Sequence, residues 1–154
     1  MHDIEVLPLI ARWMHILAAV FAVGGVFYVR VVLTSATQAV LEPEQRETLR
    51  EALAGRWRRV IHTCILLFLA SGLYNYLAIV RLRHEGQALY HALFGVKFLL
   101  ALTVFALAIA LTGRARWSAP LRVNRRTWLT VLLVLATTII LISGILRSIP
   151  AAFV

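Results

Sequence analysis

The chain has 154 residues, 61% of them hydrophobic, with a mean hydropathy of +0.84 and a formal net charge of +9. This apolar fraction exceeds the roughly 45–50% of soluble globular domains and excludes an ordinary soluble fold. The charge does not indicate a nucleic-acid partner, because most arginines flank apolar segments, where they set membrane orientation. The single cysteine, Cys64, excludes an intrachain disulfide and a cysteine-based zinc site.

Four long apolar segments predict four membrane-spanning helices within one domain, 1–154. The predicted spans are 9–33, 59–80, 90–112 and 127–147. About 20 mainly apolar residues cross a hydrocarbon core of ~30 Å. Because lipid offers no hydrogen bonds to exposed backbone, such segments must be helical. The expected fold class is therefore all-α, an integral membrane four-helix bundle with lipid as its surroundings.

The connection between the first two spans is the one sizeable polar region. Pro43 suits the first turn of a helix, and Gly55 suits a C-terminal cap. These signals predict a separate helix over 43–55 on the cytoplasmic membrane surface.

Arginine distribution predicts the orientation of the four spans. The first and third loops are rich in arginine, whereas the second loop holds only Arg81 and Arg83. Short arginine-rich loops stay in the cytoplasm. We therefore expect both termini on the outer, periplasmic side of a bacterial inner membrane.

Two histidines near the start of the first and third spans are the strongest functional candidates. His15 and His91 each lie within an apolar segment, where an ionisable residue suggests a function. The first and third spans run in the same direction, so the two imidazoles are expected at similar depth near one face. This arrangement suits two axial ligands of one iron, that of haem b. The alternative is structural: an interfacial His91 and a hydrogen-bonded core His15.

Neighbouring residues extend this hypothesis. Ala19 and Gly95 each follow a histidine by four positions, so they share its helix face and leave space for a flat macrocycle. Arg12 lies three residues before His15 and nearer water, where it suits a haem propionate. Further arginines expected at the same end are Arg81, Arg83 and Arg147.

Lys97 is the only lysine and the candidate catalytic residue. It follows His91 by six positions and therefore points about 120° away around the helix. It could bind a carboxylate of a porphyrin or quinone, relay protons, or extend to the outer surface. His62 lies near the opposite end of its span, where headgroup-level placement competes with a second cofactor site.

Three segments resemble known membrane families over residues 12–105. The segment "HI…VGGVFYVRVVL" after Trp13, "RR…SGLYNYL" and "YHALFGVKFLLAL" are similar to the first three helices of the HemJ family. This resemblance implies a b-type haem, a haem ligand at His15, a functional lysine at Lys97 and protoporphyrinogen oxidation. The segment "FGVKFLLAL" also resembles the CopD family, which implies copper handling.

The resulting prediction is a membrane b-type haem protein that transfers electrons between the haem and a quinone or an external redox protein. Two histidine ligands would fill both axial positions, which favours electron transfer over oxygen binding. The alternatives are a HemJ-like haem-dependent protoporphyrinogen oxidase, which would make the chain a membrane oxidoreductase, CopD-like copper transport, and a non-catalytic scaffold. The pair Gly24-Gly25 allows close helix contact within or between chains, so a homo-oligomer stays open.

Overall fold

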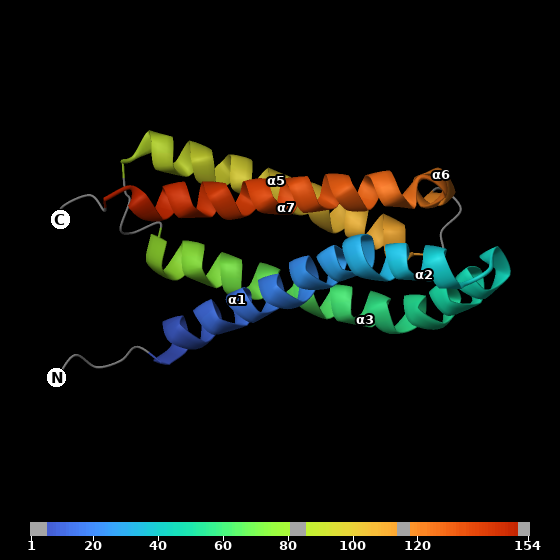
Figure 1. Ribbon diagram of the computed structural model, residues 1–154. Coiled ribbons are helices and arrows are strands. Elements are labelled where there is room, and N and C mark those ends of the chain that lie inside the picture. The colour runs from blue at the N-terminus through green and yellow to red at the C-terminus, as the bar shows by residue number, and fades with distance from the viewer. Residues whose placement is uncertain (1–5, 81–85, 114–117, 151–154) are drawn as a thin grey trace.

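The computed structural model describes residues 6–80, 86–113 and 118–150, and the elements within these ranges are helical throughout (Figure 1). Within the described residues, four continuous helical segments, here called rods, are long and apolar enough to cross a membrane. They are Val6–Val40, Pro43–Ala78, Ala88–Thr112 and Arg125–Ser148. The chain is thus an all-α, multi-pass membrane protein, which confirms the prediction of four spanning helices.

Each rod is assembled from the following elements. The first consists of α1 (Val6–Phe27), the π-helical segment η1 (Tyr28–Leu33) and α2 (Thr34–Val40). The second consists of α3 (Pro43–Asn75) and the π-helical segment η2 (Tyr76–Val80). The third and fourth are α5 (Ala88–Thr112) and α7 (Arg125–Ser148), and the short helix α6 (Ala119–Val123) lies between them in the chain.

The helices form two antiparallel hairpins that pack against each other (Figure 1). In one hairpin α1 contacts α3, and in the other α5 contacts α7; the hairpins meet where α3 contacts α5 and α1 contacts α7. The start of α1 and the end of α7 lie at one end of the bundle, here called the terminal end, and α6 lies at the opposite end, the α6 end. As expected, α1 and α5 run in the same direction.

The polar connection differs from the expected surface helix. Instead of ending at Gly55, α3 continues without a break from Pro43 to Asn75, and Gly55 does not adopt a positive φ. A glycine inside a helix costs only about 1 kcal/mol relative to alanine, so surrounding helix-forming residues easily carry the helix through it. The predicted start is correct: Pro43 opens the helix, and the Gln45 side chain accepts a hydrogen bond from the Glu42 backbone at 3.1 Å.

Two contacts position the helices relative to one another. The indole of Trp57 on α3 lies so close to Gly25 on α1 that a Cβ there would stand 2.0 Å from the ring atom Cη2. Arg30 on η1 donates from Nε to the Thr130 hydroxyl at 2.9 Å and to the Arg126 carbonyl at 3.2 Å, which ties the first rod to α7. A hydrophobic cluster lies nearby between α5 and α7, formed by Leu111, Leu129 and Leu132.

Candidate cofactor site

A cavity of about 390 Å³ lies at the terminal end, bounded by residues from all four rods. Its polar lining includes Arg12, His15, Asn75, Tyr76, Lys97, Ser143 and Arg147. The cavity therefore brings together side chains that the sequence separates by more than a hundred positions. We call it the terminal cavity.

His15 is held by a defined hydrogen-bond chain. Its Nδ1 lies 2.8 Å from the Ser71 hydroxyl on α3, and Ser71 is only 1% exposed. The same hydroxyl donates its single hydrogen to the Leu67 carbonyl at 2.5 Å. Ser71 can then only accept from His15, so the imidazole proton resides on Nδ1. The lone pair lies on Nε2, which hydrogen-bonds no described residue.

The imidazole is also fixed by packing. Its ring meets Phe68 edge to face at a centroid distance of 5.0 Å. Gly72 lies against the ring as well, because a Cβ built there would stand 3.6 Å from His15 Cε1, an ordinary van der Waals distance. Held by Ser71, Phe68 and Gly72, His15 presents one ring orientation to the cavity. Ser71 carries no local sequence signal for this role, because its partner lies 56 positions away.

Positive charge dominates the cavity. Arg12, Lys97 and Arg147 line it, and none of its described lining residues is an aspartate or glutamate. Lys97 lies close enough to His15 for their charges to interact. Guanidinium and ammonium groups around a cavity without acidic lining favour a ligand that carries carboxylates.

An aromatic wall closes the side formed by η2 and α5. Tyr76, the first residue of η2, stacks on Phe94 with a centroid distance of 4.0 Å and an interplanar angle of 13°. The Tyr76 hydroxyl lies 3.3 Å from His91 Nδ1. His91 is thus connected to the cavity through Tyr76, although it does not itself contribute to the lining.

The sequence-predicted site residues divide into two groups. His15, Arg12 and Lys97 meet at the terminal cavity, together with Arg147. The structure does not bring His91, Ala19 or Gly95 to its wall, and ligation by His91 stays a prediction. A Cβ added at Gly95 would meet nothing within 4 Å, so this glycine does leave open space. Arg81 and Arg83 lie outside the described residues.

The remaining donors lie elsewhere. His62 is exposed on α3 and its Nδ1 donates to the Arg58 carbonyl at 2.7 Å, whereas Cys64 is buried. Within residues 6–80, 86–113 and 118–150, no group of three or more His, Cys, Asp or Glu side chains could hold a metal ion. A haem iron makes a smaller demand, because the porphyrin supplies four nitrogens and the protein only axial ligands.

No protein-family model, no curated protein and no solved structure matches the chain.

Proposed function

We propose that this membrane protein binds a b-type haem in the terminal cavity, where His15 would hold the iron, and that it exchanges electrons with a quinone or a redox protein. The observation that carries this proposal is the Ser71–His15 hydrogen bond, which leaves an unprotonated Nε2 beside a cavity rich in cations. Neutral imidazole with its second nitrogen hydrogen-bonded is the usual form of a metal-ligating histidine.

The residues present fit this group in three respects. The imidazole supplies a ligand nitrogen, Arg12, Lys97 and Arg147 supply charges for two propionates, and the stacked rings of Tyr76 and Phe94 form an apolar wall. Bound haem supplies one-electron chemistry, whose potential depends on axial ligands, hydrogen bonding and burial.

The chain's own residues have separate tasks in this proposal. Ser71 holds the His15 proton on Nδ1 and so keeps Nε2 available as a donor. Arg12, Lys97 and Arg147 would bind the haem propionates and so keep the haem in the cavity. The Tyr76 hydroxyl at the cavity wall lies 3.3 Å from His91 Nδ1, and His91 stays the candidate second iron ligand that the sequence predicts.

The first experiment is an absorption spectrum of the detergent-purified chain, oxidised and reduced, with metal analysis. We expect a b-type spectrum. We expect His15→Ala to lose at least about tenfold in haem affinity, because losing even a hydrogen-bond partner of a metal ligand costs about 10–100-fold. His62→Ala is the matched control, since His62 is exposed and bonded only within its own helix. A protein that stays colourless after haem is supplied, or equal loss in both variants, refutes the proposal.

His91→Ala separates two forms of the proposal. If His91 is the second ligand, its removal converts a low-spin spectrum to high-spin and allows carbon monoxide to bind. If His91 acts only through Tyr76, the unmodified protein and the His91→Ala variant should have the same spin state.

A second candidate is haem-dependent oxidation of a tetrapyrrole, with its electrons passed to the quinone or redox protein; it is favoured because Lys97 and His15 line the same cavity. It predicts that protoporphyrin quenches tryptophan fluorescence and that Lys97→Met weakens this binding. Copper transport is less well supported by the side chains of the cavity. Cu(I) prefers Met and Cys ligands, and none of the described lining residues is Met or Cys.

Membrane placement completes the proposal: the terminal end faces the periplasm of a bacterial inner membrane. The support is the concentration of arginine near the α6 end. In a Cys64→Ser background, Ser148→Cys should react with a membrane-impermeant maleimide in intact cells, whereas Val123→Cys should react only after lysis. The reverse labelling pattern would invert the orientation.

A further inference from the structure

The two hairpins are joined firmly toward the α6 end. Arg30 of η1 donates to the Thr130 hydroxyl on α7 at 2.9 Å, and Val26 of α1 packs against the hydrophobic cluster between α5 and α7. Between the other two helices, Phe68 on α3 stacks on Phe105 on α5 with a centroid distance of 5.8 Å. These contacts, here called the joint, hold one hairpin against the other on both sides of the bundle.

The hairpins are joined on one side only at the terminal end. There η2 and α5 stay in contact through the stacked rings of Tyr76 and Phe94. On the other side the start of α1 lies well apart from the end of α7 (Figure 1). Among the residues that the structure describes, no hydrogen bond, ion pair or ring contact joins α1 to α7. Arg12 of α1 and Arg147 of α7 nevertheless line the same terminal cavity, so they stand on opposite sides of this separation.

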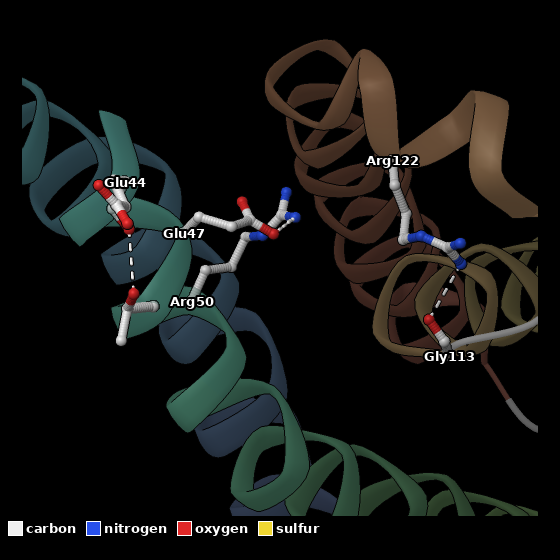
Figure 2. Close-up of polar contacts among 6 residues, drawn as sticks. Glu44, Glu47, Arg50, Gly113 and Arg122 are labelled. Carbon is white, nitrogen blue, oxygen red and sulfur yellow. Dashed lines mark hydrogen bonds and ion pairs between the residues drawn. The ribbon is translucent and has the colours of Figure 1, made fainter. Parts of the chain in front are cut away.

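These two arginines carry charges of the same sign and lack partners. Neither Arg12 nor Arg147 forms a hydrogen bond or an ion pair with a described residue. Arginines at the α6 end differ, because Arg50 forms an ion pair with Glu47 and Arg122 donates to a backbone carbonyl at 3.1 Å (Figure 2). Like charges repel, most strongly where little water screens them. Without an anion between them, Arg12 and Arg147 therefore oppose the approach of α1 to α7.

We infer that the terminal cavity closes around its ligand: a ligand with two carboxylates binds Arg12 and Arg147 together and draws the start of α1 toward the end of α7, while the joint acts as the hinge. Each guanidinium matches one carboxylate in a bidentate pair, so a dianion replaces the repulsion by two charge-assisted contacts. Hinge closure around a ligand is a common protein motion. The inference rests on the proposed function only in its choice of a carboxylate ligand for this cavity.

The number of carboxylates decides whether closure is favoured. A ligand shifts a conformational equilibrium only by the difference between its affinities for the two forms. A ligand with two carboxylates contacts both arginines only when α1 and α7 approach each other, so it binds the closed form more tightly. The same ring without carboxylates makes neither contact and has no such preference.

The test measures distances between spin labels by pulsed electron paramagnetic resonance, on the full chain in detergent with Cys64→Ser. Labels at Leu7→Cys and Ser148→Cys report on the terminal end, and labels at Val31→Cys and Val123→Cys report on the α6 end; all four positions are exposed. The probe is metal-free protoporphyrin, which carries two carboxylates, and its dimethyl ester is the control. We expect protoporphyrin to shift the terminal pair to shorter distances and to leave the other pair unchanged. The ester should change neither.

A charge variant tests the same mechanism without any ligand. Arg147→Gln removes the repulsion with Arg12 and should by itself shift the terminal pair to shorter distances. Arg126→Gln is the matched control, because it removes an exposed arginine from the opposite end of α7, where only the backbone carbonyl is used. If protoporphyrin fails to quench tryptophan fluorescence and so does not bind, the proposed function fails, and this comparison still decides the inference. An unchanged terminal pair with protoporphyrin bound, or equal distances in the two arginine variants, overturns it.

Discussion

Gly25 offers a sharp test of the packing between α1 and α3. In the structure, a Cβ at this position would lie 2.0 Å from Trp57 Cη2 and 2.8 Å from Cζ3. Carbon atoms pack at about 3.5–4.0 Å, so Gly25→Ala forces the indole or the helix to move by about 1.5–2 Å. Overpacking of this kind costs about 1–3 kcal/mol.

Gly24 supplies the control, because a Cβ there would meet nothing within 4 Å. Both substitutions gain the same helix propensity of up to about 1 kcal/mol. That gain cancels when the two variants are compared. The free energy of unfolding of Gly25→Ala should therefore be about 1–3 kcal/mol lower than that of Gly24→Ala. The measurement is reversible unfolding in mixed detergent, followed by circular dichroism.

A double-mutant cycle assigns the cost to the indole. In a Trp57→Ala background the difference between the two glycine variants should fall below about 0.5 kcal/mol, the usual limit of additivity for groups that do not touch. If the two variants are equally stable in the unmodified chain, or if the difference survives removal of Trp57, the close approach of α1 and α3 described here is wrong.

Three further predictions concern the site and its supports. Ser71→Ala should reduce haem affinity about 10–100-fold. Ser143→Ala should not, because the Ser143 hydroxyl on the cavity wall donates to the Ile139 carbonyl of its own helix; equal titration curves would refute the role of Ser71. Tyr76→Phe should keep the stacked aromatic wall but change the His91 imidazole resonances in NMR spectra, and unchanged resonances would exclude their hydrogen bond. Arg30→Gln should lower the free energy of unfolding by about 1 kcal/mol in the same detergent assay, and an unchanged value would show that the bonds to α7 contribute nothing.

Sequence reasoning succeeded where the controlling physics is local. Four apolar segments of sufficient length can only be helices in lipid, and the structure has four such rods. The start of α3 was equally readable from Pro43. Its continuation through Gly55 was not, because a glycine permits a helix end without requiring one, and the choice depends on the residues that pack around it.

The candidate site shows the same division. The residue types that line the cavity, an intramembrane histidine with Arg12 and the only lysine, were identifiable because ionisable groups are costly in lipid. Which of them meet was not identifiable, since the rotation of each helix about its axis is set by its neighbours. Spacing along one helix indicated that Lys97 and His91 point in different directions, and only the packed bundle decided that Lys97 and His15 line the same cavity.

The sequence by itself therefore determined that the chain forms four membrane-spanning helices and that histidine and cationic side chains lie near one end of them. The tertiary structure decided the partner of His15, the placement of Tyr76 between His91 and the cavity, and the tie from Arg30 to Thr130 on α7. These contacts join residues far apart in the sequence, on different helices. No local periodicity encodes them, because they arise only when the faces of several helices pack together.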